Sequence, residues 1–269
     1  MAVNWVDRVP TRANRVLITP ENGGTPYYAT VTRADEPSVV GTPVNAANLN
    51  AMQNAAGLTS NKTIYVATTG SDINEGTETS PFASISKALS IIPKNLNGYF
   101  VSINIAAGTY PENVIIRDFN CGALRITGRA GDTVTFSGLS IINSRYVEVN
   151  TISLHISNAH INIESSDVRV LSPFSASNGR YGVHVAFNSS VVFSSTVTVN
   201  NATSYAVVAT MNSRIYLYHL LGGGNFVSVA AIHGSVVGIK ANEDTSETKY
   251  QTTDGGRIYA GAQQSVLNY

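Results

Sequence analysis

The sequence predicts a mainly β protein whose chain winds as a parallel β-helix of about seven coils, each roughly 21–24 residues long. Two observations lead to this prediction. A short pattern recurs along the second half of the chain: an apolar residue, a small polar residue, a Ser or Gly, and then an apolar run. The segments beside it alternate apolar and polar residues with a period of two, which is typical of β-strands.

The composition supports a folded, β-rich chain and excludes several classes of protein. Of the 269 residues, 43% are hydrophobic and 13% are charged, with 17 basic against 17 acidic side chains. This balance does not provide the basic surface that a nucleic-acid-binding protein needs. Because Cys121 is the single cysteine, an intrachain disulfide is excluded and a cysteine-based metal site is not expected. We expect neither a metal nor a cofactor.

The beginning of the sequence carries no recognisable targeting signal. The segment MAVNWVDRVPTR lacks the apolar core of a signal peptide. Along the whole chain, no apolar run is as long as a membrane-spanning helix requires. We therefore expect no secretion signal and no membrane insertion.

The first sixty residues differ in kind from the rest and form the first predicted domain, 1–60. The segment NRVLITPENGGTPYYATVTRA predicts a β-hairpin around the turn from Glu21 to Gly24. The segment GTPVNAANLNAMQNAAG follows, with Thr42 as N-cap, Pro43 at the first helical position and Gly57 as the stop, which predicts a helix. The second predicted domain, 61–269, is the β-helix.

Residues 61–98 are expected to cap the first coil. Ser80 and Pro81 form a suitable helix start, and an apolar face follows at Phe82, Ile85, Leu89 and Ile92. Such a helix would cover the open end of a solenoid, where unpaired strands would otherwise meet water. The acidic residues nearby, Asp72 and Glu75 with Asn74, leave two interpretations open: a turn that solvates the cap, which we prefer, and a calcium loop, which lacks a bidentate Glu at the required spacing.

This stretch also carries a family resemblance. The segments IYVATTGSDINEGTETSPFASISKALSIIP and VSINIAAGTYPENVII closely resemble the N-terminal entry of pectin-lyase-like right-handed β-helix proteins. The resemblance implies a right-handed solenoid that begins at about Ile64.

Seven positions define the repeat, and we expect them to stack as a ladder of turn residues. They follow one another at intervals of 23, 21, 24, 24, 21 and 21, and six of the seven follow an apolar residue. Asn and Asp bond their own backbone and tolerate left-handed conformations, which suits a tight turn. The seven residues are Asn120, Asn143, Glu164, Asn188, Asn212, His233 and Asp254.

In the late coils, the strands that follow these turns carry apolar residues at both odd and even positions, so that both faces of each strand are apolar. Either Val191, Phe193, Ile215 and Leu217 point outward, or Val192, Tyr216 and Tyr218 do, because a strand buries only one parity. Both alternatives leave an apolar or aromatic outer stripe, which marks a covered interface or a ligand platform. We therefore predict a binding surface or trimer interface among Val191, Phe193, Ile215, Tyr216, Leu217 and Tyr218.

Catalytic candidates are few. From Val168 to Asn242 the sequence contains no Asp or Glu, so the middle and late coils cannot hold the carboxylate pair of a glycoside hydrolase. Glu164 and Asp167 flank one turn and are the weak candidates, although solvation of the turn is the preferred role. Arg125, Glu148 and Arg169 occupy the same position in consecutive coils, which predicts a charge ladder. His160 and His184, one coil period apart, are expected to stack on the outside.

A second resemblance concerns function. The segments VNWVDRVPTRANRVLIT and VVGTPVNAANLNAM, within residues 3–52, look like the virion-proximal part of tail fibre and baseplate proteins from phages and prophages. The alternative is a small α+β cap for the solenoid. The resemblance implies a virion tail protein made in the host cytoplasm, attached through residues 1–60 to other tail or baseplate proteins, and trimeric.

We therefore expect a homotrimeric tail appendage that contacts host surface polysaccharide or holds structure without catalysis. Self-association is the first interpretation of the late apolar stripe, and sugar binding to tyrosine faces is the second. The rival function is a polysaccharide depolymerase, a lyase or hydrolase of the pectin-lyase-like class. A bacterial surface adhesin is a third interpretation, which the missing signal peptide disfavours. The glycan, the host and the neighbouring tail protein cannot be named from the sequence.

Overall fold

The computed structural model describes residues 15–18, 25, 27–30, 57–150, 153–157 and 160–261. The chain divides into two units, residues 1–56 and 57–269. In the first unit, β1 (Arg15–Ile18) and β2 (Tyr27–Thr30) pair antiparallel, with Arg15 opposite Thr30. The predicted hairpin is confirmed. The predicted helix between Thr42 and Gly57 lies, except for Gly57, outside the described residues.

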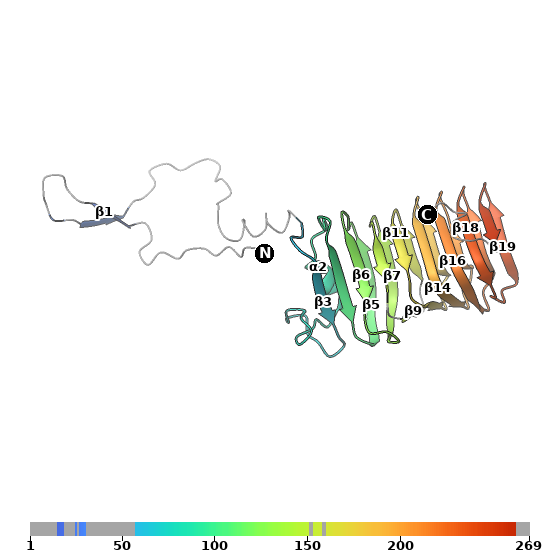
Figure 1. Cartoon of the computed structure of the whole chain (residues 1–269), viewed down its shortest axis with the longest axis horizontal. Helices are drawn as coiled ribbons and strands as arrows, with labels where there is room; N and C mark the ends of the chain where they lie inside the picture. The colour runs from blue at the N-terminus through green and yellow to red at the C-terminus, as the bar shows by residue number, and fades with distance from the viewer. Residues whose placement is uncertain are drawn as a thin grey trace. The chain divides into compact units, whose positions relative to one another are not determined.

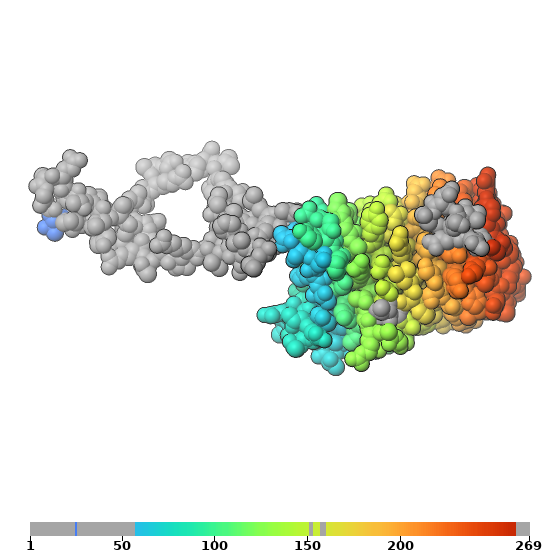
Figure 2. Space-filling model, in the orientation of Figure 1, coloured from blue at the N-terminus to red at the C-terminus, as the bar shows by residue number. Residues whose placement is uncertain are grey.

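The second unit is a parallel β-solenoid of about seven turns, as predicted (Figure 1). Each turn contributes strands to three faces of the solenoid, which we call A, B and C in the order in which the chain reaches them. Longer strands bend from one face to the next, as β14 does at a register shift between Phe193 and Thr196. In Figure 2 the coils form a packed surface from the cyan end near β3 to the red end near β19. No helix in the described ranges is long and apolar enough to cross a membrane.

Face A consists of β3 (Lys62–Val66), β4 (Phe100–Ile105), β6 (Ala123–Thr127), β8 (Val147–Val149), β11 (Asp167–Val170), the first parts of β14 (Ser190–Asn200), β16 (Arg214–Gly223) and β18 (Val236–Asn242), and β20 (Arg257–Ala260). Face B consists of the first parts of β5 (Gly108–Arg117) and β7 (Thr133–Ile142), then β9 (Ser153–Ser157), β12 (Phe174–Ser177) and the second parts of β14, β16 and β18. Face C consists of the second parts of β5 and β7, then β10 (Ile161–Glu164), β13 (Tyr181–Ala186), β15 (Tyr205–Ala209), β17 (Val227–Ile232) and β19 (Thr248–Thr253).

The core is built of apolar columns that run along the axis, one residue per strand. Their members pair in register and are almost completely buried, because every second residue of a strand faces the interior. One column on face A consists of Ile64, Ile103, Ile126, Val149, Val170, Phe193, Leu217 and Ile239.

The corner between faces C and A contains a ladder of buried serines. The backbone N–H of Ser144 donates to Ser166 Oγ at 2.9 Å, and that of Ser166 donates to Ser189 Oγ at 3.1 Å. Ser213 and Ser235 continue the ladder at 3.3 and 3.1 Å. Each hydroxyl therefore satisfies a buried donor of the preceding coil, which would otherwise lose its hydrogen bond to water.

The capping helix is shorter than the sequence predicts. Helix α2 spans Ile85–Ser90, and its N-cap is Ser84, whose hydroxyl accepts from the N–H of Lys87 at 3.1 Å. The predicted start at Ser80 and Pro81 is therefore wrong. Phe82 is buried, as the predicted apolar face requires, but it lies before the helix and forms a bridge with Val66. Two acidic side chains bind the backbone N–H groups at the start of α2, a role that the sequence leads us to expect of the segment with Ser80 and Pro81.

These anchors are Asp72 and Glu112. The Asp72 carboxylate accepts from the N–H groups of Ala83 and Ser84 at 3.0 and 2.9 Å, and the Ser84 hydroxyl hydrogen bond holds the pKa of this carboxyl below its ordinary value. The Glu112 carboxylate accepts from the N–H groups of Ile85 and Ser86, both at 2.9 Å. Asp72 thus serves the cap through hydrogen bonds, in agreement with the preferred turn interpretation.

Candidate functional site

The structure decides which parity of the late coils faces outward. Val168 pairs with Val191, Val191 with Ile215, and Ile215 with Val237. The fourth residue after each predicted turn position is Val168, Val192, Tyr216 and Val237, so the repeat predicts that Val192 and Tyr216 belong to this column. In the structure these two lie one residue too far along the chain. A one-residue shift exchanges the two faces of a strand, so the offset decides which side chains are available for binding.

Four of the six residues predicted for the binding or trimer surface lie in the core. Val191, Phe193, Ile215 and Leu217 are 0% exposed. The outward residues are Val192, Tyr216 and Tyr218. Val192 and Tyr216 pack together on the outside, while Tyr218 is 44% exposed and lies under the Lys240 ammonium, 4.4 Å from its ring centroid. The outer stripe is therefore the Val192, Tyr216 and Tyr218 alternative.

The predicted ladder of turn residues is only partly present. Asn143, His233 and Asp254 lie in corners with left-handed backbone, and His233 Nε2 lies 3.4 Å from Asp254 Oδ2. Asn188 and Asn212 also have positive φ, but each is the second left-handed residue of its corner, since Phe187 and Met211 come first. They therefore lie one position later than the other three, and Asn212 lies opposite Gly234.

Two further predicted ladder positions are wrong. Asp118, not Asn120, stacks below Asn143 and accepts from its Nδ2 at 2.7 Å. Glu164 is the last residue of β10, and Ser165, with φ 49°, forms the corner.

Glu164 and Asp167 do not form a pair. Glu164 lies on face C, where its Oε1 accepts from Asn162 Nδ2 at 2.8 Å. Asp167 lies on face A, where it forms an ion pair with Arg145. Because the corner turns the chain between them, the two carboxylates serve different faces.

The register on face A aligns the three residues of the predicted charge ladder, and one of the two expected ion pairs is present. Arg125 pairs with Glu148, and Glu148 with Arg169. Arg125 Nε lies 3.7 Å from Glu148 Oε1, and its guanidinium lies 4.5 Å from the Phe100 ring centroid. No ion pair is found between Glu148 and Arg169 in the described part of the chain, which leaves Arg169 without an acidic partner there.

Face C carries a cluster of aromatic rings, which we call the tyrosine–histidine cluster: Tyr181, Tyr205, His160 and His184. The rings of Tyr181 and Tyr205 are stacked, with centroids 6.0 Å apart and an interplanar angle of 15°. Tyr181 also contacts both imidazoles, at 5.6 and 5.1 Å between centroids. All four residues are half-buried, so ring surface remains available to a ligand. The two histidines, predicted to stack on each other, instead both contact Tyr181, His160 edge-on at 83° and His184 tilted at 34°.

A chain of hydrogen bonds orients His184 within this cluster. Because Asn162 Nδ2 donates to Glu164, its Oδ1 accepts from His184 Nδ1, at 2.9 Å. His184 Nε2 then faces the Thr210 hydroxyl, at 3.3 Å. The Thr210 hydroxyl can donate to Nε2 or accept from it, so these contacts fit a neutral imidazole that donates through Nδ1 and also fit the protonated ring.

Electrostatics favour the neutral form of His184. Burial lowers the pKa of His184, and the neighbouring His160 and Arg180 lower it further against the opposing effect of Glu164. Burial also lowers the pKa of His160. These lowered pKa values favour the neutral form of both imidazoles, and the Arg180 guanidinium lies over the Tyr181 ring, 5.1 Å from its centroid.

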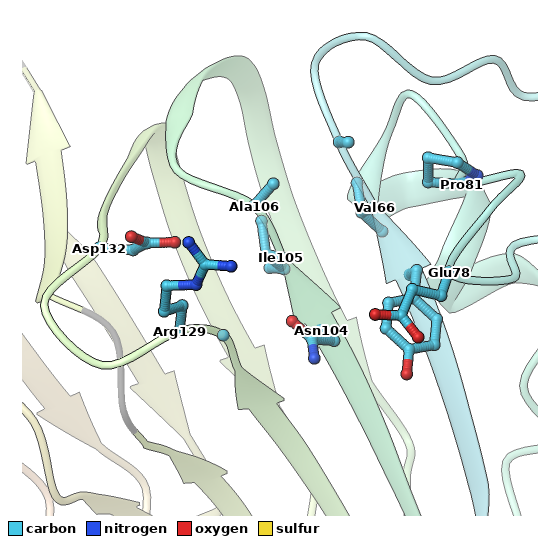
Figure 3. Close-up of a pocket in the computed structure, with 11 residues that line it drawn as sticks. Val66, Glu78, Pro81, Asn104, Ile105, Ala106, Arg129 and Asp132 are labelled. Atoms are coloured by element: carbon cyan, nitrogen blue, oxygen red, sulfur yellow. The ribbon is translucent and has the colours of Figure 1, made fainter.

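A separate pocket of about 480 Å³ lies at the capped end of face A (Figure 3). Figure 3 shows the carboxylates of Glu78 and Asp132 on opposite sides of it, with the Asn104 amide between them and the Arg129 guanidinium next to Asp132. Asn104 and Tyr65, which are register partners on adjacent strands, both line the pocket. Two carboxylates and a guanidinium can hold a polar ligand, and carboxylate pairs are also the groups that glycoside hydrolases use.

Metal ligation finds no support in the described ranges. No group of three or more His, Cys, Asp or Glu side chains that could hold a metal ion occurs there. Cys121 is exposed and unpaired with another cysteine.

Comparisons with known proteins give one distant likeness. No family model and no curated protein matches the chain. Among solved structures, a rhamnogalacturonan lyase matches at 12% identity over 74% of this chain and 86% of that chain, with a TM-score of 0.17. A likeness this distant carries no argument about the activity of this chain.

Several residues of these sites were missed in the sequence. Tyr181 and Tyr205 are separated by one coil period, as are His160 and His184, so the repeat could have placed the tyrosines on adjacent strands. The serine ladder follows the turn residues directly, but Ser in that position also suits an ordinary exposed turn. Nothing in the sequence indicated that Glu78 belongs to a site, because its loop lies near Asp132 only after the coils have stacked.

Proposed function

We propose that this chain is a phage or prophage tail protein, a fibre or baseplate appendage, whose solenoid binds host surface polysaccharide without cleaving it. The observation that carries the binding part is the tyrosine–histidine cluster. Stacked tyrosine rings present flat apolar faces with hydroxyl groups at their edge, and sugar rings pack on such faces through their C–H groups. Beside them, Asn162 Nδ2, which donates one of its two N–H groups to Glu164, and the Thr210 hydroxyl retain hydrogen-bonding capacity for a sugar.

The virion role rests on residues 3–52, whose sequence resembles virion-proximal segments of tail proteins. On this proposal residues 1–60 attach the protein to other tail or baseplate proteins, and the protein is located in the virion tail. A truncation that lacks residues 1–60 should then fail to join particles while the solenoid still binds polysaccharide. Incorporation of the truncated protein into particles would contradict the attachment role.

The homotrimer is part of the same proposal. Of the outward stripe, Tyr218 is 44% exposed and is the aromatic residue open to contact between copies, whereas Val192 and Tyr216 are already buried, at 7% and 5% exposed. Sedimentation equilibrium at micromolar concentration should give three times the mass of one chain. A monomer under these conditions would exclude the trimer.

Polysaccharide binding is tested with surface polysaccharides purified from candidate bacterial hosts. The double variant Tyr181→Ala/Tyr205→Ala should lose binding by about tenfold or more, since aromatic anchors dominate such contacts. Tyr99→Ala, which removes a partly exposed ring near the cap, is the matched control and should bind as the wild type does. Equal binding by the double variant would reject the cluster as the site.

A depolymerase is the second candidate, and the pocket between Glu78 and Asp132 is the observation that favours it. Incubation with the same polysaccharides, followed by assays for new reducing ends and for unsaturated products, separates the two functions. Product formation that is lost in Glu78→Gln or Asp132→Asn would establish the enzyme. Loss in Glu164→Gln or Asp167→Asn would locate the chemistry at the carboxylates that the sequence suggested.

A further inference from the structure

Face A carries an outward arginine on every second strand. These residues are Arg125 on β6, Arg169 on β11, Arg214 on β16 and Arg257 on β20, with β8, β14 and β18 between them. Because neighbouring strands lie about 4.8 Å apart, successive arginines are about 10 Å apart along the solenoid axis. Arg214 and Arg257 share one column, since both pair through Val236. Arg169 lies in the neighbouring outward column, two residues further along its strand, because it pairs with Val192.

The acidic groups of this face are already occupied. Glu148 lies against Arg125, and Asp167 forms its ion pair with Arg145. In the described ranges no carboxylate lies within ion-pair distance of Arg169, Arg214 or Arg257. All three are exposed, so their charges are directed to solvent. The nearby Lys240 is stacked over Tyr218.

A groove of about 500 Å³ lies on the same face and contains two of these arginines. Arg169 and Arg214 line it, with Val192 and Tyr146 as apolar parts of its wall. Two carboxylates, Glu148 and Asp167, line it as well, and each of them already lies against an arginine outside the track, Arg125 or Arg145. A ligand in this groove would meet guanidinium groups that have no internal partner, together with apolar surface for a ring. Guanidinium groups bind carboxylates and sulfates through paired, charge-assisted hydrogen bonds.

We propose that Arg169, Arg214 and Arg257 form a binding track for an acidic polysaccharide that carries a carboxylate or sulfate on about every second sugar. One sugar of an extended chain advances by about one strand spacing, about 4.8 Å, so alternate acidic sugars match arginines on alternate strands. This inference deepens the proposed function, because it names the class of glycan and a second contact surface. It does not depend on the tyrosine–histidine cluster of face C.

The test uses hyaluronan, which has a glucuronate on every second sugar, and the full-length protein in isothermal titration calorimetry. Dextran is the neutral control polymer, and polyglutamate is the acidic peptide control. The wild type should bind hyaluronan, with an affinity that decreases as salt rises, and should bind dextran and polyglutamate at least about tenfold more weakly. The triple variant Arg169→Gln/Arg214→Gln/Arg257→Gln should lose about tenfold or more of the hyaluronan affinity and most of its salt dependence.

Arg117→Gln is the matched control, because Arg117 is an exposed arginine on face C, and it should bind as the wild type does. Unchanged affinity of the triple variant would overturn the track, as would equal binding of polyglutamate, which would indicate an acidic peptide site. Circular dichroism of the triple variant should match the wild type, since the three side chains are exposed. If host polysaccharide binding is lost in Tyr181→Ala/Tyr205→Ala but kept in the triple variant, the proposed function holds and the track fails.

Discussion

His184 Nδ1 lies 2.9 Å from Asn162 Oδ1 on the adjacent coil, and the amide of Asn162 is itself held by Glu164. The imidazole is therefore oriented by the preceding coil, and its second nitrogen faces Thr210 on the following one. This relationship joins three consecutive coils of face C through side chains. Burial within this network lowers the pKa of His184 and so favours its neutral form.

The stability of the solenoid should decrease as the pH falls below the ordinary histidine pKa of about 6.5. His160 and His184 have lowered pKa values in the folded protein, so the unfolded chain binds more protons at mildly acidic pH. Stability therefore rises with pH through this window and is fully present above it. Urea unfolding at pH 5.5 and pH 8 measures the difference. His184→Gln should reduce this pH dependence, and an unchanged dependence in that variant would contradict the assignment.

The parity of the late coils predicts a large difference between neighbouring aromatic positions. Phe193→Ala removes a side chain that is 0% exposed and should lower the free energy of unfolding by about 3–5 kcal/mol. Tyr218→Ala removes a ring that is 44% exposed and should cost about 1 kcal/mol or less. Urea unfolding curves of both variants provide the comparison. The opposite order would mean that the other parity faces the core.

The serine ladder, and not the asparagine positions, should carry the stability of the corner between faces C and A. Ser189→Ala leaves the buried N–H of Ser166 without its acceptor and should cost about 1–3 kcal/mol. Asn188→Gly, at the adjacent residue with φ 58°, keeps the left-handed backbone accessible and should change stability by less than about 1 kcal/mol. If thermal denaturation shows equal losses, the ladder does not have the role assigned to it.

The cap should depend on Glu112. Glu112→Ala leaves the N–H groups of Ile85 and Ser86 without their acceptor and should destabilise the capped end by about 0.5–2 kcal/mol. Hydrogen exchange of α2 measures the local effect. Glu75→Ala, an exposed carboxylate at the same end, is the control and should leave exchange unchanged. Faster exchange in the control alone would contradict the assignment.

The sequence was sufficient to predict the solenoid, because a period of about two dozen residues and alternation with period two require stacked parallel strands. It also predicted the hairpin and the register of Arg125, Glu148 and Arg169. These features depend on regular spacing or local turn chemistry, and both are visible in a single sequence.

The orientation of the late coils could not be predicted for a physical reason. In VVF and IYLY both parities are apolar, so hydrophobic patterning does not choose between them. The choice depends on how many residues form the corner, and Phe187 and Met211 add a position that the pattern hid. The helix start was missed because Ser84, held by Asp72 from a distant loop, is a stronger cap than the local Ser80–Pro81 signal.

The most direct test of the central claim is the crystal structure of the protein with an oligosaccharide from a host surface polysaccharide. The account predicts an intact oligosaccharide on face C, with one sugar ring lying parallel to the ring of Tyr181 or Tyr205 and hydrogen bonds to the residues around His184. A cleaved oligosaccharide in the pocket between Glu78 and Asp132, with face C empty, would contradict it.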